Sequence, residues 1–103
     1  MMVLYHFKES GSDKIWGWIK TFDGALSFWG RTRGSLTFKH YDRLWAAEDQ
    51  ATKKHIKGYR LVTNYKKEVG PEGIWTISPD ALELLPEDWI DIYILAKLGM
   101  TKF

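Results

Sequence analysis

The 103-residue chain contains no cysteine. It therefore has no disulfide bond, no thiolate metal site and no cysteine nucleophile. The sequence also lacks a run of about 18 apolar residues, the length that a membrane-spanning helix requires. The apolar stretch at residues 1–5 is too short for a secretory signal, because His6 and Lys8 interrupt it. We therefore expect a cytoplasmic protein in a reducing compartment, without a membrane partner.

Motifs of catalysis are missing as well. No Ser-His-Asp arrangement, phosphate-cradling glycine loop or metal signature stands out in the sequence. His40 and Asp42 lie close in sequence, but a third metal ligand is lacking. His55 falls on the apolar stripe of a predicted helix, where a core histidine is more common than a catalytic base. We expect a protein that is not an enzyme and needs no cofactor.

Aromatic residues are plentiful. They make up 16% of the chain and include six tryptophans. Large rings bury much area each, so a single small domain can form a core without cross-links. The apolar and charged fractions, 45% and 27%, are those of an ordinary globular protein.

The net charge of +2 hides a strong asymmetry. Residues 31–67 hold ten Lys or Arg against three acids, whereas residues 68–103 hold two Lys against seven acids. A basic middle next to an acidic tail favours a polyanionic partner. A solvated charged surface would give the same pattern.

The first half of the chain alternates in the manner of β-strands. Strands are predicted over 3–8, 14–22 and 25–31, and Asp23-Gly24 is a strong signal for a two-residue hairpin turn. That turn pairs Phe22 with Ala25, Ile19 with Phe28, Trp18 with Trp29 and Trp16 with Arg31. Ile19, Leu26 and Phe28 then share an apolar core face. The opposite face carries Trp16, Trp18, Lys20, Trp29 and Arg31.

A second turn is expected at Arg33-Gly34-Ser35. A three-residue loop there places Lys39 opposite Trp29 and Thr37 opposite Arg31. Leu36 and Phe38 would then join Phe28 in the core.

Helical periodicity follows from Asp42 to about Lys57, with Asp42 as the expected N-cap and Gly58 as the stop. Leu44, Ala47, Ala51 and His55 form one stripe of this helix. A further strand is predicted over 59–69.

The last third of the chain predicts a short strand over 74–77 and a final helix over 89–98. The final helix is apolar nearly all round, so part of it must be buried against the domain or against a partner. Ile90, Ile94 and Leu98 form the strip that we assign to a partner, most simply a second copy of the chain.

The order of motifs in residues 13–65 resembles the WGR domain. This family is named for its Trp-Gly-Arg triplet and occurs in poly(ADP-ribose) polymerases that sense DNA damage and as bacterial modules. The matching features are Trp29-Gly30-Arg31, the nearby Gly34, an Ala- and Lys-rich helix, and Lys57-Gly58-Tyr59. The resemblance implies an α+β fold in which one helix packs across an antiparallel sheet. We expect a WGR-like domain over residues 1–69, and a strand and helix extension over 70–103 that lies outside the resemblance and packs on the same domain.

The resemblance also implies a role at DNA ends or breaks, in which Trp29 stacks on a terminal sugar or base and Arg31 makes polar contacts. Without a catalytic domain or zinc finger, the damage-signalling role does not carry over. The residues that we expect to bind nucleic acid are Trp29, Arg31, Trp16, Trp18, Lys20, Arg33, Lys39, Lys53 and Lys57. Lys54, Arg60, Lys66 and Lys67 add to the basic surface. The alternative is an interaction adaptor that docks a protein, or a second copy, through its last helix.

Overall fold

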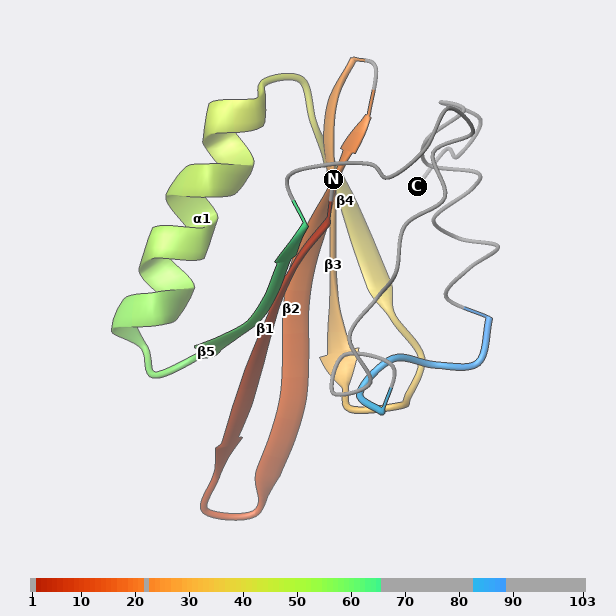
Figure 1. Cartoon of the computed structure of the whole chain (residues 1–103), viewed down its shortest axis with the longest axis vertical. Coiled ribbons are helices and arrows are strands. Elements are labelled where there is room, and N and C mark those ends of the chain that lie inside the picture. The colour runs from red at the N-terminus through yellow and green to blue at the C-terminus, as the bar shows by residue number, and fades with distance from the viewer. Residues whose placement is uncertain (1, 22, 66–82, 89–103) are drawn as a thin grey trace.

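The computed structural model describes residues 2–21, 23–65 and 83–88. They form an α+β fold in which a five-stranded antiparallel sheet carries one helix on one face (Figure 1). In chain order the elements are β1 (Met2–Glu9), β2 (Ser12–Thr21), β3 (Gly24–Arg31), β4 (Thr37–Tyr41), α1 (Leu44–Ile56) and β5 (Arg60–Tyr65). The strand order is β4-β3-β2-β1-β5. The predicted fold class is confirmed, whereas the predicted C-terminal strand and helix lie outside the described residues.

Both faces of the sheet are apolar, because side chains of both parities along β1, β2 and β3 are large and hydrophobic. The face away from the helix holds the buried cluster Leu4, Ile15, Ile19, Leu26, Phe28 and Leu85. Leu36 and Phe38 pack against this cluster. The prediction that Ile19, Leu26 and Phe28 share a core face is therefore confirmed.

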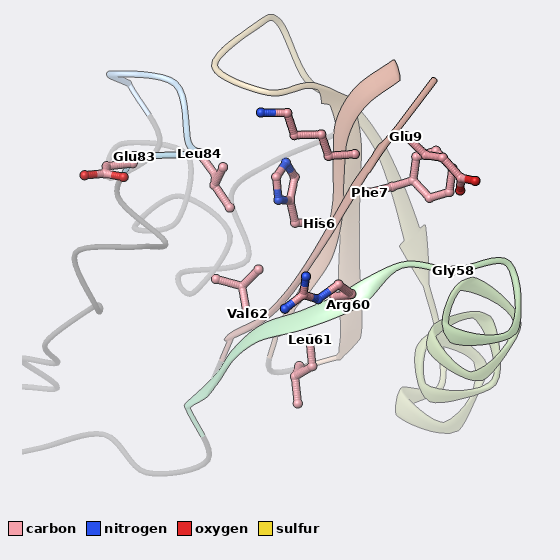
Figure 2. Close-up of a pocket in the computed structure, with 10 residues that line it drawn as sticks. His6, Phe7, Glu9, Gly58, Arg60, Leu61, Val62, Glu83 and Leu84 are labelled. Carbon is pink, nitrogen blue, oxygen red and sulfur yellow. The ribbon is translucent and has the colours of Figure 1, made fainter. Parts of the chain in front are cut away.

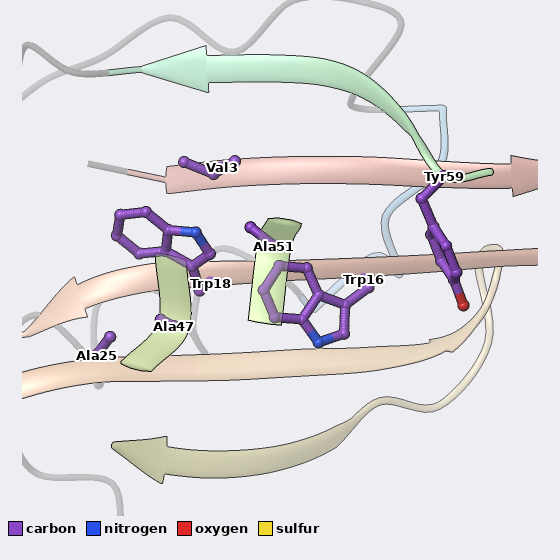
Figure 3. Packing of buried hydrophobic residues seen from close by; sticks show 7 residues of the cluster. All are labelled: Val3, Trp16, Trp18, Ala25, Ala47, Ala51 and Tyr59. Atoms are coloured by element: carbon purple, nitrogen blue, oxygen red, sulfur yellow. The ribbon is translucent and has the colours of Figure 1, made fainter. Parts of the chain in front are cut away.

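Helix α1 covers the other face, which holds the tryptophans (Figure 3). The buried residues there are Val3, Trp16, Trp18, Ala25, Ala47, Ala51 and Tyr59. The helix presents small side chains, Ala47 and Ala51, and these leave room for the indole rings below. Trp16 and Trp18 are only 3% and 4% exposed. These two rings, which were expected to bind nucleic acid, are therefore buried beneath the helix.

The register of the β2–β3 hairpin differs from the prediction by two residues. Trp16 pairs with Trp29, Trp18 with Ser27 and Ile19 with Leu26. The turn lies one position earlier than expected, because Thr21 pairs with Gly24. Gly24 has a φ of 146°, and a Cβ there would overlap the carbonyl oxygen of Tyr41. Its missing side chain thus serves the close approach of β4. A shift of two residues leaves every side chain on its predicted face.

The register of the β3–β4 pair also differs from the prediction by two residues. Trp29 pairs with Thr37 and Ser27 with Lys39, so the loop is longer than the predicted three residues. Lys39 still shares a face with Trp29, and Phe38 still shares a face with Phe28.

The two ends of α1 are built differently. Arg43 occupies the N-cap position without a side-chain hydrogen bond, so the predicted cap by Asp42 is wrong. At the other end the amides of Gly58 and Tyr59 donate to the carbonyls of His55 and Lys54, 3.0 and 3.1 Å away. With φ of 106° at Gly58, this is the Schellman arrangement that ends helices at glycine. His55 is exposed, so the expectation of a core histidine is wrong.

Within the described ranges, no helix has the length and apolarity needed to cross a membrane.

Candidate nucleic-acid interface

Four cationic side chains gather where α1 ends above the sheet. Lys14 and Arg31 are paired residues of β2 and β3, Lys54 lies in the last turn of α1, and Lys57 is its C-cap. The Nζ atoms of Lys14 and Lys54 lie 5.8 and 5.3 Å from the centre of one ring, that of Tyr59. We call these four residues the cation cluster. Three segments that are distant in sequence contribute to it.

The floor of the cation cluster is aromatic. The rings of Phe7 and Tyr59 are 5.1 Å apart between centroids, and the Nζ of Lys14 lies 5.1 Å from the centre of Phe7. Ring faces attract cations through their quadrupole. Within the described residues, the ammonium groups of Lys14 and Lys54 therefore lie against rings and not against carboxylates.

The positive charge of the cation cluster is not neutralised within the described part of the chain. No acidic side chain there forms an ion pair with any of its four members. The pKa of Lys54 is lowered, first by burial and then by the positive charges of Lys57 and Lys14. The last carbonyls of α1 offset the charge only in part. An anion at this position would relieve both the repulsion and the loss of solvation.

A groove of about 790 Å³ continues from the cation cluster past the ends of the inner strands β1, β2 and β3. Besides Lys14 and Arg31 it is lined by Lys8 and Arg33, so four cations border it. Among the described residues, its carboxylates belong to Asp13 and Glu83. The described cations therefore exceed the described acids.

One of these carboxylates is already engaged. Asp13 Oδ1 accepts from the hydroxyl of Thr32 at 2.6 Å and lies 2.5 Å from Nε2 of His6. These hydrogen bonds, that of Thr32 first, lower the pKa of Asp13. Arg33 is oriented by a hydrogen bond from its Nε to the backbone carbonyl of Glu83. The hydrogen bonds fix the wall of the groove, whereas Lys8 and Arg31 have no ion-pair partner among the described residues.

Trp29 lies next to the cation cluster on the same face. It is half-buried and stands between its paired residues Trp16 and Thr37. Arg31 follows two residues later and is exposed. A partly exposed indole beside a free guanidinium is the combination that stacks on a base or sugar and contacts its phosphate.

The other predicted binding lysines do not join the cation cluster. Lys20 pairs with Ala25, six residues along β2 from Lys14 and thus roughly 20 Å away. The Nζ of Lys39 lies 5.2 Å from the ring centre of Tyr41. The Nζ of Lys53 is 3.5 Å from Oδ2 of Asp49 on the same helix. Of the predicted cations, Arg31, Lys54 and Lys57 belong to the cation cluster, and Arg33 lies along the groove.

Lys14 is the member that the sequence prediction missed. The predicted register placed Trp16 opposite Arg31, whereas the observed register places Lys14 there. The signal was present in the sequence, because a hairpin turn one residue earlier gives the correct pair. The predicted partner strip of Ile90, Ile94 and Leu98 lies outside the described residues.

Two other places on the surface, the group around His40 and a hollow along β1 and β5, are weaker candidates for a ligand site. His40 Nε2 lies 3.1 Å from Asp23 Oδ1, and its Nδ1 lies 3.6 Å from Asp42 Oδ1. In the ranges that the structure describes, no group of three or more residues is placed to hold a metal ion. A hollow of about 540 Å³ along β1 and β5 mixes Lys8 and Arg60 with Glu9 and Glu83 (Figure 2). The charges of its described side chains balance, so they favour no class of ligand.

Comparison with known proteins gives one structural neighbour. The chain is similar to the crystal structure of a protein from Bacteroides fragilis, with 22% identity and a TM-score of 0.47. The match covers 81% of this chain and 26% of that protein. No protein-family model matches the chain, and no curated protein gives a significant match.

Proposed function

We propose that this protein binds nucleic acid, and DNA in particular, through the cation cluster and the adjoining groove. The observation that carries the proposal is the gathering of Lys14, Arg31, Lys54 and Lys57 at one end of α1 without acidic partners in the described part of the chain. Phosphate groups neutralise such a cluster, and the release of their counterions supplies binding free energy.

The side chains in and beside the cation cluster make different kinds of contact with the nucleic acid. Arg31 can hold a phosphate through two parallel hydrogen bonds, whereas the lysines act as point charges. Trp29 offers the ring on which a base or sugar can stack. The groove past Lys8 and Arg33 then gives the nucleic-acid strand a path along the ends of β1, β2 and β3.

The resemblance of residues 13–65 to WGR domains supports DNA as the ligand, with strand ends and nicks as the preferred form. Trp29 and Arg31 are the triplet residues of that resemblance, and both lie at the cation cluster. In this proposal Trp16 and Trp18 support the sheet from beneath α1 and make no contact with DNA.

The test is a fluorescence anisotropy titration of labelled single-stranded, blunt duplex and nicked DNA over a range of salt concentrations. If four phosphates are neutralised on a duplex, the log–log slope of affinity against salt is about −3.6. Tighter binding to nicked or blunt ends than to a closed hairpin supports the end-binding form. Absence of salt-dependent binding at micromolar protein would contradict the proposal.

A further inference from the structure

Trp18 has a buried polar atom without a partner. The residue is 4% exposed, and its indole Nε1 has no hydrogen-bond partner among the described residues. An indole N–H can only donate, and buried donors in proteins are almost always paired. The neighbouring Trp16 is equally buried, but its Nε1 is not a buried atom without a hydrogen-bond partner. The orphaned N–H therefore points to an acceptor that is supplied from outside.

A hollow lies next to this atom. It measures about 390 Å³, within the range of small-molecule sites, and opens between α1 and β1. Val3, Tyr5, Trp18 and Ala51 form its walls, and Glu48, Thr52 and His55 complete the lining. Figure 3 shows the indole nitrogen of Trp18 turned toward the side on which Val3 and Ala51 lie. Trp18 forms part of the wall of the hollow together with the ring of Tyr5, and its buried donor lies just behind this wall.

The mouth of the hollow offers a hydrogen-bond acceptor, whereas the indole N–H of Trp18 is a donor. Glu48 lines the mouth, and its exposed carboxylate forms no ion pair in the described part of the chain. The hydroxyl of Thr52 is occupied, because it donates to the backbone carbonyl of Glu48 at 3.2 Å. A ligand in this hollow therefore meets an acceptor at the mouth, and it reaches the donor of Trp18 when that ring shifts toward the hollow.

We infer that this hollow binds a planar heteroaromatic ring carrying both an acceptor and an amino group, that is, cytosine or another amino-bearing nucleobase. The ring packs against Tyr5 and Trp18, a ring nitrogen or carbonyl accepts from Trp18 Nε1, and the amino group donates to Glu48. Uracil has similar size and shape but lacks the amino group, so it binds more weakly. A free nucleoside and the base at a strand end present the same chemistry.

The experiment follows the indole N–H of Trp18 in ¹H–¹⁵N spectra of the full ¹⁵N-labelled chain. The six tryptophans give six indole signals, and the signal that is lost in Trp18→Phe belongs to Trp18. If that variant fails to fold, through-bond assignment of the unchanged protein identifies the same signal. Cytidine is expected to shift this peak saturably, at roughly tenfold lower concentration than uridine. Glu48→Ala removes the preference for cytidine, whereas Asp49→Ala, the neighbouring acid on α1, leaves it intact.

An unmoved Trp18 signal at millimolar cytidine, or equal affinity for cytidine and uridine, would overturn the inference. A single-stranded oligonucleotide ending in cytidine separates it from DNA binding through the cation cluster. Salt-dependent oligonucleotide binding with an unmoved Trp18 signal leaves the proposed function standing and removes the nucleobase site. A shift with cytidine but no oligonucleotide binding leaves a site for free nucleosides and removes the DNA proposal.

Discussion

Lys14 and Arg31 stand opposite one another on β2 and β3, so two cations occupy paired positions of one sheet face. Like charges at directly opposed positions destabilise a sheet. The ammonium of Lys14 rests over the rings of Phe7 and Tyr59, and no carboxylate in the described residues pairs with it. A local arrangement that lowers stability is typical of a functional site. A phosphate bound between the two cations would turn the repulsion into attraction.

Replacing Arg31 with Ala should weaken DNA binding and reduce the slope of log affinity against log salt by about one, since one phosphate contact is lost. Lys14→Ala should act in the same direction. Lys20→Ala is the matched control, because Lys20 is exposed on the same strand as Lys14 but at its far end. Anisotropy titrations over salt measure both quantities. An equal loss in Lys20→Ala would show that general charge, and not the cation cluster, drives binding.

Trp29→Ala should weaken DNA binding by about 1–3 kcal/mol if a base or sugar stacks on the ring. Trp45→Ala is the control, because Trp45 is 68% exposed and lies on α1 away from the triplet. Circular dichroism establishes that both variants are folded. Unchanged affinity in a folded Trp29→Ala protein would exclude stacking at this position.

Acid should destabilise the protein through Asp13 and Asp23. The pKa of each lies below its ordinary value of 3.8, because Thr32 and then His6 hydrogen-bond Asp13, and Thr21 and then His40 hydrogen-bond Asp23. A lowered folded-state pKa adds stability that is present above pH 3.8 and is lost as the pH falls through the folded value. The free energy of unfolding, measured with urea, should therefore decline between about pH 5 and pH 2.

Thr32→Val removes the largest of the contributions to Asp13 and should flatten this decline. Thr52→Val is the control, since its hydroxyl bonds only a backbone carbonyl within α1. The same acid dependence in both variants would contradict the assignment to Asp13.

Gly17→Ala should destabilise the sheet by about 1–3 kcal/mol, as overpacking of a core does. Gly17 pairs with Phe28, and a Cβ there would lie 2.5 Å from the Cζ of that ring and 2.6 Å from the carbonyl oxygen of Val3. Ser12→Ala, at the exposed start of β2, should change stability by less than about 0.5 kcal/mol. Chemical denaturation compares them. A fully stable Gly17→Ala protein would mean that β1 and Phe28 can move apart without cost.

Alternation along the strands was enough to predict the sheet and its faces. Side chains such as Ile19 and Phe28 fall on one face in any register that shifts by two residues. The register itself depends on the turn, and Asp23-Gly24 predicted the wrong one. Gly24 is needed because β4 passes close to it, a long-range contact that a local turn signal does not contain.

The candidate site was predictable only in part for the same reason. Arg31 and Lys57 follow from the triplet and the helix end, but Lys14 joins them only in the true register. Trp16 and Trp18 were expected to be open, because both faces of the sheet are apolar and the sequence does not show which one the helix covers. The small residues Ala47 and Ala51, which match the bulk of the two indoles, were the one available clue.

The unequal ends of α1 determine how this helix comes apart. Its last turn is tied down by the amides of Gly58 and Tyr59, whereas its first turn has neither a capping side chain nor an acidic residue. Fraying therefore starts at Leu44, and amide exchange should slow progressively toward His55. The early-opening end carries Ala47, which packs in one cluster with Ala25 and Trp18 (Figure 3). Solvent thus reaches the buried indoles from that end first, while the lysines at the other end keep their positions.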